Sequence, residues 1–282
     1  MIDEGKVNDD EGPAFKKLAD IRLGSSIDES TYLWKGPSAN NFIVPKAPPT
    51  IRYIRDFITP EEEELFLTEV YAAPKPKWQQ LLNRRLQNWG GIIGKKALIS
   101  DDNIPKWLNF AIDKLMSLPD AFPASNRPNH VLINEYQPGQ GIMAHTDGPA
   151  FYPLVSTISL GSDLFLDYYR PICPQNTISK ELRYVGSMLL ERRSLILVTD
   201  QAYSYYLHEI DERLTDEITD KVFNRCITQK EIGEKIDRKL RVIRTKSLCS
   251  MNDYMRKKLK STNDFVDQTC DTVSVKVDEF VH

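Results

Sequence analysis

Two of the four histidines in this 282-residue chain lie in a pattern that suits a metal ion. His145-Thr146-Asp147 places an imidazole and a carboxylate two residues apart, so both point to the same side of an extended segment. His208 lies in a later strand-like run. Two imidazoles and one carboxylate form the facial triad, which binds ferrous iron on one face and leaves positions open for a cosubstrate and O₂.

Two plainer interpretations stay open at this point. His145 and Asp147 also suit a polar pair at the end of a strand, and His208 suits a buried histidine satisfied by a neighbour. The preceding segment, Asn134 to Gly141, favours the metal site. It predicts a strand that leads into a tight turn, and this would present both side chains from a fixed scaffold.

The elements that must position these residues follow from hydrophobic periodicity. A helix is expected over residues 60–73, because Thr59, Pro60 and Glu62 supply a cap, a first-turn proline and a capping box. A second helix is expected over 105–118. Strands are expected at 51–57, 130–136, 154–160, 163–169, 187–190, 194–199, 203–210 and 239–245. Many short strands in succession predict a sandwich, jelly roll or barrel.

Residues 130–149, HVLINEYQPGQGIMAHTDGP, resemble the core of the AlkB family of iron(II)- and 2-oxoglutarate-dependent dioxygenases. Supporting segments lie at 73–78, 84–91, 152–162 and 202–208, so the resemblance covers residues 50–210. It implies a mainly β fold with flanking helices, namely a double-stranded β-helix, which is a form of jelly roll. It is far more specific than the His-x-Asp spacing alone.

The resemblance also implies a reaction and a ligand set. His145, Asp147 and His208 would bind Fe(II), and Asn134 and Tyr136 would lie beside 2-oxoglutarate. The reaction implied is oxidative decarboxylation of 2-oxoglutarate by O₂ to succinate and CO₂, coupled to hydroxylation of a substrate C–H bond. A hydroxylated N-methyl group then breaks down to formaldehyde and the demethylated amine. The iron carries the difficult chemistry, and the protein supplies positioning.

The far carboxylate of 2-oxoglutarate needs a cation, and the bidentate fork of arginine suits it. The family places such an arginine on a late strand in an Arg-x-Ser/Asn-x-Thr-x-Arg pattern. Here Arg241 and Thr245 match part of that pattern, and its other members are absent. A second register uses Arg238 and Arg244, whose spacing puts them on the same face of a strand. We favour Arg241, with Arg244 as the alternative. Because the chain departs from the family pattern here, it also remains open whether the protein has lost turnover.

A segment that contains basic but no acidic residues precedes the predicted jelly roll. From Val70 to Ser100 there are six basic residues and no acid, with two tryptophans interleaved. Cations for phosphates and aromatic rings for bases suit a single strand or a flipped base. In the family this region forms a nucleotide-recognition lid, so the resemblance implies a nucleic-acid partner. The implied lid residues are Lys77, Trp78, Arg84, Arg85, Gln87, Asn88 and Trp89. The alternative is a solvated basic face over core tryptophans.

Other functions stay open beside this leading interpretation. In nucleobase demethylases of the family an acidic residue shortly after His-x-Asp helps to read the base, whereas here residues 148–152 contain no carboxylate. A protein or modified-RNA substrate is therefore an alternative, as is a jelly-roll binding module without turnover. Zinc hydrolysis by the same three ligands is a third, although Asn134, Tyr136 and the late arginines favour an oxygenase.

The composition fits a globular domain, with 41% hydrophobic and 27% charged residues. No apolar run approaches the roughly 18 residues of a membrane span. Four cysteines without a CxxC pair predict neither a zinc knuckle nor a redox dithiol. The acidic start does not fit a targeting signal, so we expect a location in the cytoplasm and nucleus. We also expect a monomer without a membrane partner. The net charge of −3 averages a basic lid with acidic surroundings and excludes no nucleic-acid partner.

These observations predict three parts. An extended or disordered amino-terminal tail is expected over residues 1–49, and a carboxyl-terminal tail over 251–282. Between them, residues 50–250 form the AlkB-like dioxygenase domain, which includes the basic lid at 70–100 and an insertion at 211–237.

Overall fold

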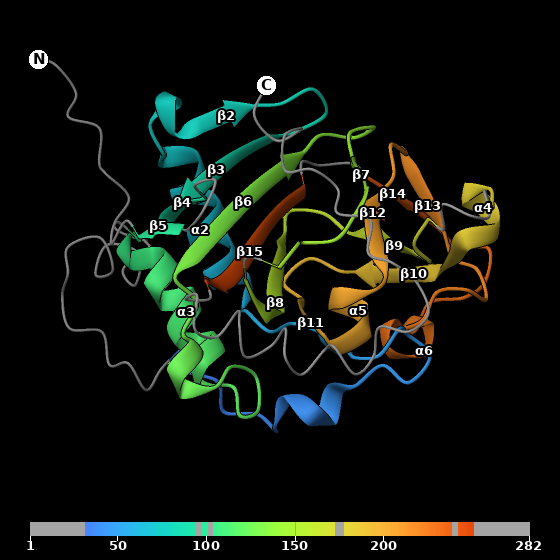
Figure 1. The fold of residues 1–282 in the computed structure, drawn as a ribbon, viewed down its shortest axis with the longest axis horizontal. Coiled ribbons are helices and arrows are strands. Elements are labelled where there is room, and N and C mark those ends of the chain that lie inside the picture. The colour runs from blue at the N-terminus through green and yellow to red at the C-terminus, as the bar shows by residue number, and fades with distance from the viewer. Residues whose placement is uncertain are drawn as a thin grey trace, which may run out of the picture.

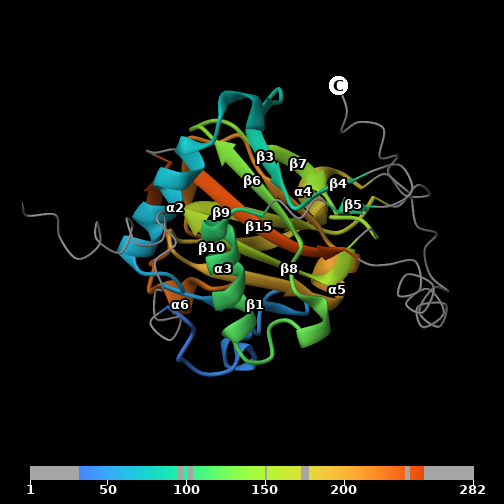
Figure 2. The same ribbon diagram turned by 90° about the vertical axis from the view of Figure 1, so that its left-hand side faces the viewer.

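The structure is a computed structural model that describes residues 32–93, 98–100, 104–149, 151–172, 178–238 and 242–250. Two antiparallel sheets pack face to face in these residues, and two long helices cover the outer face of the larger sheet (Figure 1). The view in Figure 2 looks from the helical side and places α2 and α3 in front of the strands. The expected fold class, a jelly roll with flanking helices, is confirmed.

The larger sheet, which we call the major sheet, has seven strands in the order β1-β11-β8-β15-β6-β3-β2. Its strands are β1 (Ile51–Ile54), β2 (Trp78–Gln80), β3 (Arg85–Trp89), β6 (His130–Tyr136), β8 (Phe151–Leu160), β11 (Leu195–Thr199) and β15 (Val242–Ser250). Strand β15 pairs with β6 on one side and β8 on the other, so its backbone is held on both edges. It is therefore a central strand, and pairing on both edges fixes the positions of its side chains.

The minor sheet has four strands in the order β10-β9-β12-β7. Its strands are β7 (Ile142–His145), β9 (Leu164–Tyr169), β10 (Tyr184–Leu190) and β12 (Leu207–Ile210). Two further hairpins are β4 (Gly91–Ile93) with β5 (Leu98–Ser100), and β13 (Thr215–Glu217) with β14 (Lys235–Asp237). Strand β7 pairs with β12 alone and forms an edge of the minor sheet within the described residues.

The two long helices start and end close to the predicted positions. Helix α2 (Pro60–Ala72) has the predicted capping box, in which the Thr59 hydroxyl accepts from the Glu62 amide and the Glu62 carboxylate accepts from the Thr59 amide. Helix α3 (Lys106–Ser117) buries an apolar stripe. The short helices are α4 (Lys180–Arg183), α5 (Asp200–Ser204), α6 (Arg225–Thr228), η2 (Ala39–Phe42), η3 (Lys75–Lys77) and η4 (Ala124–Asn126).

Two hydrophobic cores lie on the two faces of the major sheet. The first joins α2 and α3 to the sheet, for example through Phe66, Leu108 and Ile243. The second fills the space between the two sheets, where Val242 packs with residues such as Leu166. Because side chains alternate along a strand, even-numbered residues of β15 face the minor sheet and odd-numbered residues face the helices. This parity decides which residues of β15 can reach a site between the sheets.

Several segments differ from the sequence-based expectation. Residues 32–49, placed in the amino-terminal tail by sequence, pack against the helical core, where the Tyr32 and Phe110 rings lie 4.0 Å apart. Tyr203 lies in α5 and not in a strand, which begins only at Leu207. Part of the basic segment folds as strand β3 and pairs with β6. Tertiary packing and non-local pairing override local sequence patterns at these places.

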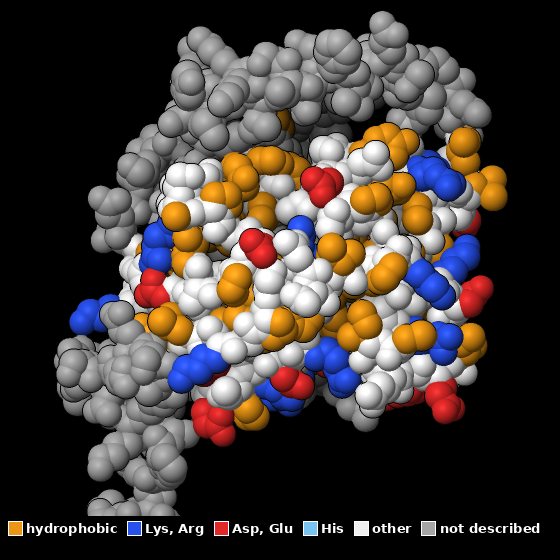
Figure 3. Space-filling model, turned by 90° about the horizontal axis from the view of Figure 1, so that it is seen from below, with side chains coloured by type: hydrophobic (Ala, Val, Ile, Leu, Met, Phe, Trp, Pro, Cys, Tyr) orange, Lys and Arg blue, Asp and Glu red, His pale blue; other side chains and the backbone are white. Residues whose placement is uncertain are grey.

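The predicted insertion is anchored to the minor sheet. Residues 215–237 form the β13–β14 hairpin and α6, and Ile218, Val222 and Ile236 pack against Phe165 and Leu189. Figure 3 looks at the molecule from below, where acidic, basic and hydrophobic side chains intermingle and neither charge gathers over a wide area. Within the described residues no helix has both the length and the apolar character of a membrane span.

Candidate metal and cosubstrate site

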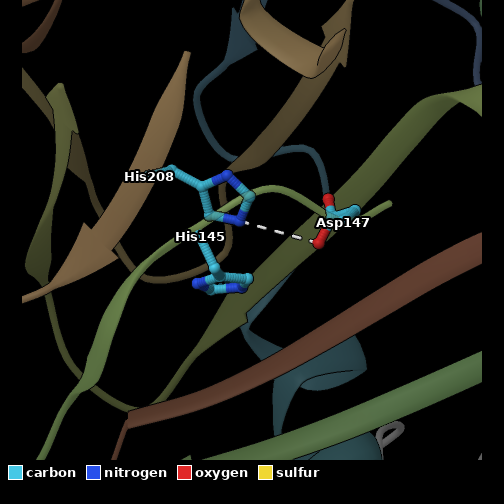
Figure 4. Close-up of side chains that lie close together, drawn as sticks. All are labelled: His145, Asp147 and His208. Carbon is cyan, nitrogen blue, oxygen red and sulfur yellow. Dashed lines mark ion pairs between the residues drawn. The ribbon is translucent and has the colours of Figure 1, made fainter. Parts of the chain in front are cut away.

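The three ligands predicted from the sequence come together at the open edge of the minor sheet. His145 at the end of β7 and His208 in β12 are paired in register, and their ring centroids lie 4.4 Å apart. Asp147 follows β7, with its Oδ1 3.6 Å from His208 Nε2 (Figure 4). One ligand atom from each residue lies within 4.8 Å of the others. We call His145, Asp147 and His208 the metal cluster.

Local contacts fix the orientation of these side chains. The His145 Nδ1–H donates to the Met143 carbonyl oxygen at 2.7 Å, which leaves the Nε2 lone pair for a metal. After Asp147 the chain turns at Gly148, whose φ of 77° suits glycine. The Tyr203 hydroxyl donates to the Gly148 carbonyl oxygen at 2.7 Å. Helix α5 therefore holds the loop that carries Asp147.

The protonation states in the metal cluster suit a divalent cation. Burial lowers the pKa of His145 and of His208, so both imidazoles are neutral and have a lone pair to give. Burial alone would raise the pKa of Asp147, but Lys246 and then the two histidines outweigh it and hold that pKa well below its usual range. Two neutral imidazoles and one carboxylate on a single face fit the ligand set for Fe(II).

Asn134 and Tyr136, predicted to lie beside the cosubstrate, are buried on β6 next to β15. Asn134 is in register with Arg244, which has 5% of its surface exposed. Burial lowers the pKa of Arg244 to about 10 and raises that of Tyr136 to about 12. The Arg244 Nε and one of its terminal nitrogens have no hydrogen-bond partner among the described residues, nor has the Tyr168 hydroxyl. These buried donors would suit a bound anion.

The other two late arginines, Arg238 and Arg241, do not take this position. Arg241, the residue favoured by the sequence pattern, lies outside the described residues. Arg238 forms a bidentate ion pair with Asp216, with both nitrogen–oxygen distances 2.7 Å. Its guanidinium is therefore occupied by the β13–β14 hairpin. Among the described residues, Arg244 is the one of these three arginines that lies on the face of β15 directed toward the metal cluster.

The predicted lid residues lie mainly on the β2–β3 hairpin, residues 78–89, which we call the basic hairpin. Two cations stack on the rings of the basic hairpin. Lys77 Nζ, from η3 just before the hairpin, lies 4.0 Å from the Trp89 ring centre, and the Arg85 guanidinium lies 4.0 Å from that of Trp78. Arg85 also forms an ion pair with buried Glu135. Much of this positive charge is thus engaged within the protein.

The remaining lid residues divide between structural contacts and the site. Gln87 is buried and donates to the Val70 carbonyl oxygen at 2.8 Å, whereas Asn88 is exposed. The Arg84 Nε donates to the Asn134 side-chain oxygen at 3.2 Å, which links the basic hairpin to the candidate cosubstrate site.

Sequence reasoning missed two residues in the site. Lys246 on β15 forms an ion pair with Asp147, and Tyr168 on β9 places a buried hydroxyl near Arg244. Once the register of β15 is known, strand parity points to Lys246, because it lies two residues after Arg244 on the same face. In the apolar stretch after Asp147, Phe151 packs into a separate buried cluster with Val155, Tyr203 and Leu248.

Comparison with known proteins gives related sequences, although no family model matches the chain. The chain is 46% identical over 204 residues to "Probable RNA/DNA demethylase ALKBH6" of Danio rerio, covering 71% of this chain and 86% of that protein. It is 28% identical over 177 residues to "Uncharacterized protein L905" of Acanthamoeba polyphaga mimivirus, covering 61% and 78%.

Among solved structures, that of OsALKBH1 superposes with a TM-score of 0.47 at 11% identity, over 71% of this chain and 99% of that chain. Likeness at this level adds nothing to the fold assignment, which rests on the order and packing of the two sheets described above.

Proposed function

Because the chain belongs to the AlkB family, we propose that it is an iron(II)- and 2-oxoglutarate-dependent dioxygenase that oxidatively demethylates or hydroxylates a nucleic acid. One observation carries the proposal. The metal cluster and the two unpartnered guanidinium nitrogens of Arg244 lie on the same side of the major sheet, so a metal ligand set and a candidate anion site share one space.

The roles of this chain's residues follow from their positions. His145, Asp147 and His208 hold the metal, and the guanidinium of Arg244 takes the far carboxylate of 2-oxoglutarate. Asn134 lies beside Arg244 across the β6–β15 pair. A metal held in this way supplies O₂ activation coupled to decarboxylation of the cosubstrate. Arg244 takes the role that the sequence pattern favours for Arg241, because its face of β15 is the one that looks toward the minor sheet.

Nucleic acid is the substrate class that we propose. The relative of 46% identity is named for RNA and DNA demethylation. In this chain, the basic hairpin reaches the site through the contact of Arg84 with Asn134, so a strand bound along it would pass close to the metal. The engaged cations, Lys77 and Arg85, hold the aromatic rings in place, while Arg84 and exposed Asn88 contact the substrate.

The test is turnover by the full chain loaded anaerobically with Fe(II) and 2-oxoglutarate and then exposed to O₂. Succinate is measured with and without methylated RNA and DNA oligonucleotides, and formaldehyde is measured in parallel. We expect succinate that depends on iron, rises with the preferred oligonucleotide and is absent in His145→Ala. Folded, iron-loaded protein that forms no succinate under any of these conditions contradicts the proposal. Stimulation by a methylated peptide and by no oligonucleotide would replace nucleic acid with protein as substrate.

A further inference from the structure

The Arg84 side chain enters the space between the two sheets from the basic hairpin. In the β3–β6 pair Leu86 lies opposite Asn134. Arg85 lies opposite Glu135, on the other face of the major sheet. Arg84 comes two residues before Leu86 and lies on the Asn134 side, where its Nε donates to the Asn134 side-chain oxygen at 3.2 Å. The two adjacent arginines therefore point to opposite faces of the major sheet.

Arg84 lies close enough to the metal cluster to act on it electrostatically. Burial is the main cause that lowers the pKa of His145, and the Arg84 charge adds to it. Burial raises the pKa of Tyr136 to about 12, and Arg84 has the largest effect among the charges that oppose this. Glu212 near the hairpin tip accepts from Asn83 instead. The one side-chain hydrogen bond of Arg84 within the described residues uses Nε, so both terminal nitrogens are available to a ligand.

The rest of the site supplies no negative charge to match this guanidinium. Asp147 is the one described carboxylate whose charge contributes to the pKa of Tyr136, and it belongs to the metal cluster. A divalent metal and Arg244 balance the charges of Asp147 and the 2-oxoglutarate dianion. The Arg84 guanidinium and the Lys246 ammonium are then in excess, so the loaded site is positive.

Methylation of a ring nitrogen divides nucleobases into two charge classes. A methyl group on N1 of adenine or N3 of cytosine gives a cation at neutral pH, with an amino group beside the methylated nitrogen. A methyl group on N1 of guanine or on N3 of uracil or thymine gives a neutral base, with a carbonyl oxygen beside the methylated nitrogen. Arginine has donors and no acceptor, so Arg84 complements the carbonyl oxygen and repels the cationic base.

The other side chains on this face of β3 are uncharged. Leu86 is buried, and Asn88, opposite Leu132, is exposed. A leucine packs against a base of either class, and a carboxamide has both donors and an acceptor to offer it. Neither side chain separates the two classes by charge, so on this strand the selection falls to Arg84.

We propose that Arg84 is a specificity-determining residue that selects neutral N-methylated bases, with a carbonyl oxygen beside the methylated nitrogen, over cationic ones. The preferred class then contains 3-methyluracil, 3-methylthymine and 1-methylguanine, and the disfavoured class 3-methylcytosine and 1-methyladenine. The inference rests on the proposed function, since it takes a methylated nucleic acid as substrate. The sequence of residues 148–152 agrees with it, because a stretch without a carboxylate offers a cationic base no counter-ion.

The experiment measures binding to the full chain without turnover, with Mn(II) and 2-oxoglutarate bound and oxygen excluded. Fluorescence anisotropy gives the affinity for two labelled RNA oligonucleotides of one sequence, which carry 3-methyluracil or 3-methylcytosine at the same position. These bases differ in one exocyclic group and in charge. We expect the 3-methyluracil strand to bind about tenfold more tightly, as for one charged hydrogen bond. The same strands with uracil or cytosine give the background affinity.

Variants of the two adjacent arginines identify the group that selects. Arg84→Met should bring the two affinities to within about threefold of each other. Arg84→Glu should reverse the preference, because a carboxylate attracts the cationic base. Arg85→Met removes the same charge from the other face and should keep the preference of the unaltered protein. Thermal melting checks the fold of each variant, and Arg84→Gln serves as the neutral variant if Arg84→Met does not fold.

Each failure has a distinct meaning. Equal affinities in the unaltered protein, or tighter binding of 3-methylcytosine, overturn the inference and leave the proposed function standing. An undiminished preference for 3-methyluracil in folded Arg84→Met also overturns it, because another group would then distinguish the bases. Loaded, unaltered protein that binds none of the four oligonucleotides overturns nucleic acid as the proposed substrate and the inference with it.

Discussion

Two buried arginines near the start of β15 have opposite surroundings. Arg238 lies in the region of the β13–β14 hairpin, where Asp216 takes both arms of its guanidinium. Arg244 lies between the two sheets, where two of its nitrogens have no partner among the described residues. Both have about the same small exposed surface, 4% and 5%. Burial alone therefore does not identify a binding residue, whereas an unsatisfied buried donor does.

The largest effect that tests this difference concerns stability at the β13–β14 hairpin. Arg238→Met leaves the buried Asp216 carboxylate without its bidentate partner and with Arg213, 3.2 Å away, as its remaining cation, so we expect the unfolding free energy to fall by about 3 kcal/mol, the lower end for a broken buried ion pair. Chemical denaturation at neutral pH measures it. Because Arg238 does not touch the site, the affinity of the folded fraction for 2-oxoglutarate should stay unchanged. A stable Arg238→Met that has lost 2-oxoglutarate binding would reverse the roles of the two arginines.

The next effect concerns the metal on which the anion site depends. His208→Ala removes one of three ligands, so Mn(II) affinity should fall by more than about a hundredfold. 2-Oxoglutarate binding should be lost with it even though Arg244 is intact. His130, which lies at the start of β6 outside the metal cluster, gives the matched control: His130→Asn should keep its Mn(II) affinity. Stoichiometric, tight Mn(II) in His208→Ala would show that the cluster is not the site.

Arg244→Met gives the third effect, on cosubstrate affinity. The variant loses the guanidinium that we propose for the far carboxylate, so the Mn(II)-loaded protein should bind 2-oxoglutarate about a hundredfold more weakly. Its unfolding free energy should be unchanged or higher, because an unpaired buried charge has been removed. Calorimetric titration and denaturation of the same sample measure both. Large destabilisation with unchanged affinity would place Arg244 in the same class as Arg238.

The smallest effect distinguishes two adjacent arginines on the basic hairpin. Arg84 contacts Asn134 in the site, whereas Arg85 is engaged by Glu135 and stacks on Trp78. Arg84→Met should weaken single-stranded RNA binding by about fivefold at low salt. Arg85→Met should leave RNA affinity nearly unchanged and lower unfolding free energy by about 1–2 kcal/mol, because buried Glu135 loses a partner. Equal losses of RNA affinity would show that the engaged charge also contacts substrate.

Sequence patterns identified most strands and both long helices because their periodicity and capping are local. The capping box of Thr59 and Glu62 is an example. They also identified the metal cluster, since His145 and Asp147 are close in sequence and the surrounding motif is specific. The pairing of β3 with β6 was not predicted, because it joins segments far apart in the chain and no local pattern encodes it.

The register of β15 shows most clearly where the sequence stops being informative. Both faces of this strand are buried, so Val242 and Ile243 are both apolar and no alternation distinguishes the two faces. The face that meets the site is set by pairing with β6 and β8. For the same reason Lys246 was not recognised, since its role depends on a parity that the sequence alone leaves undecided.

Strand β7 carries His145 at the edge of the minor sheet, and β12 carries His208 beside it. A metal ion shared by the two strands would act as a cross-link between an edge strand and its sheet, much as a disulfide does. Removing the ion should release β7 before the rest of the domain opens, which hydrogen exchange of residues 142–145 would detect. For the nucleic-acid substrate that we propose, the same edge position would allow a strand to approach the metal from the side while both hydrophobic cores stay closed.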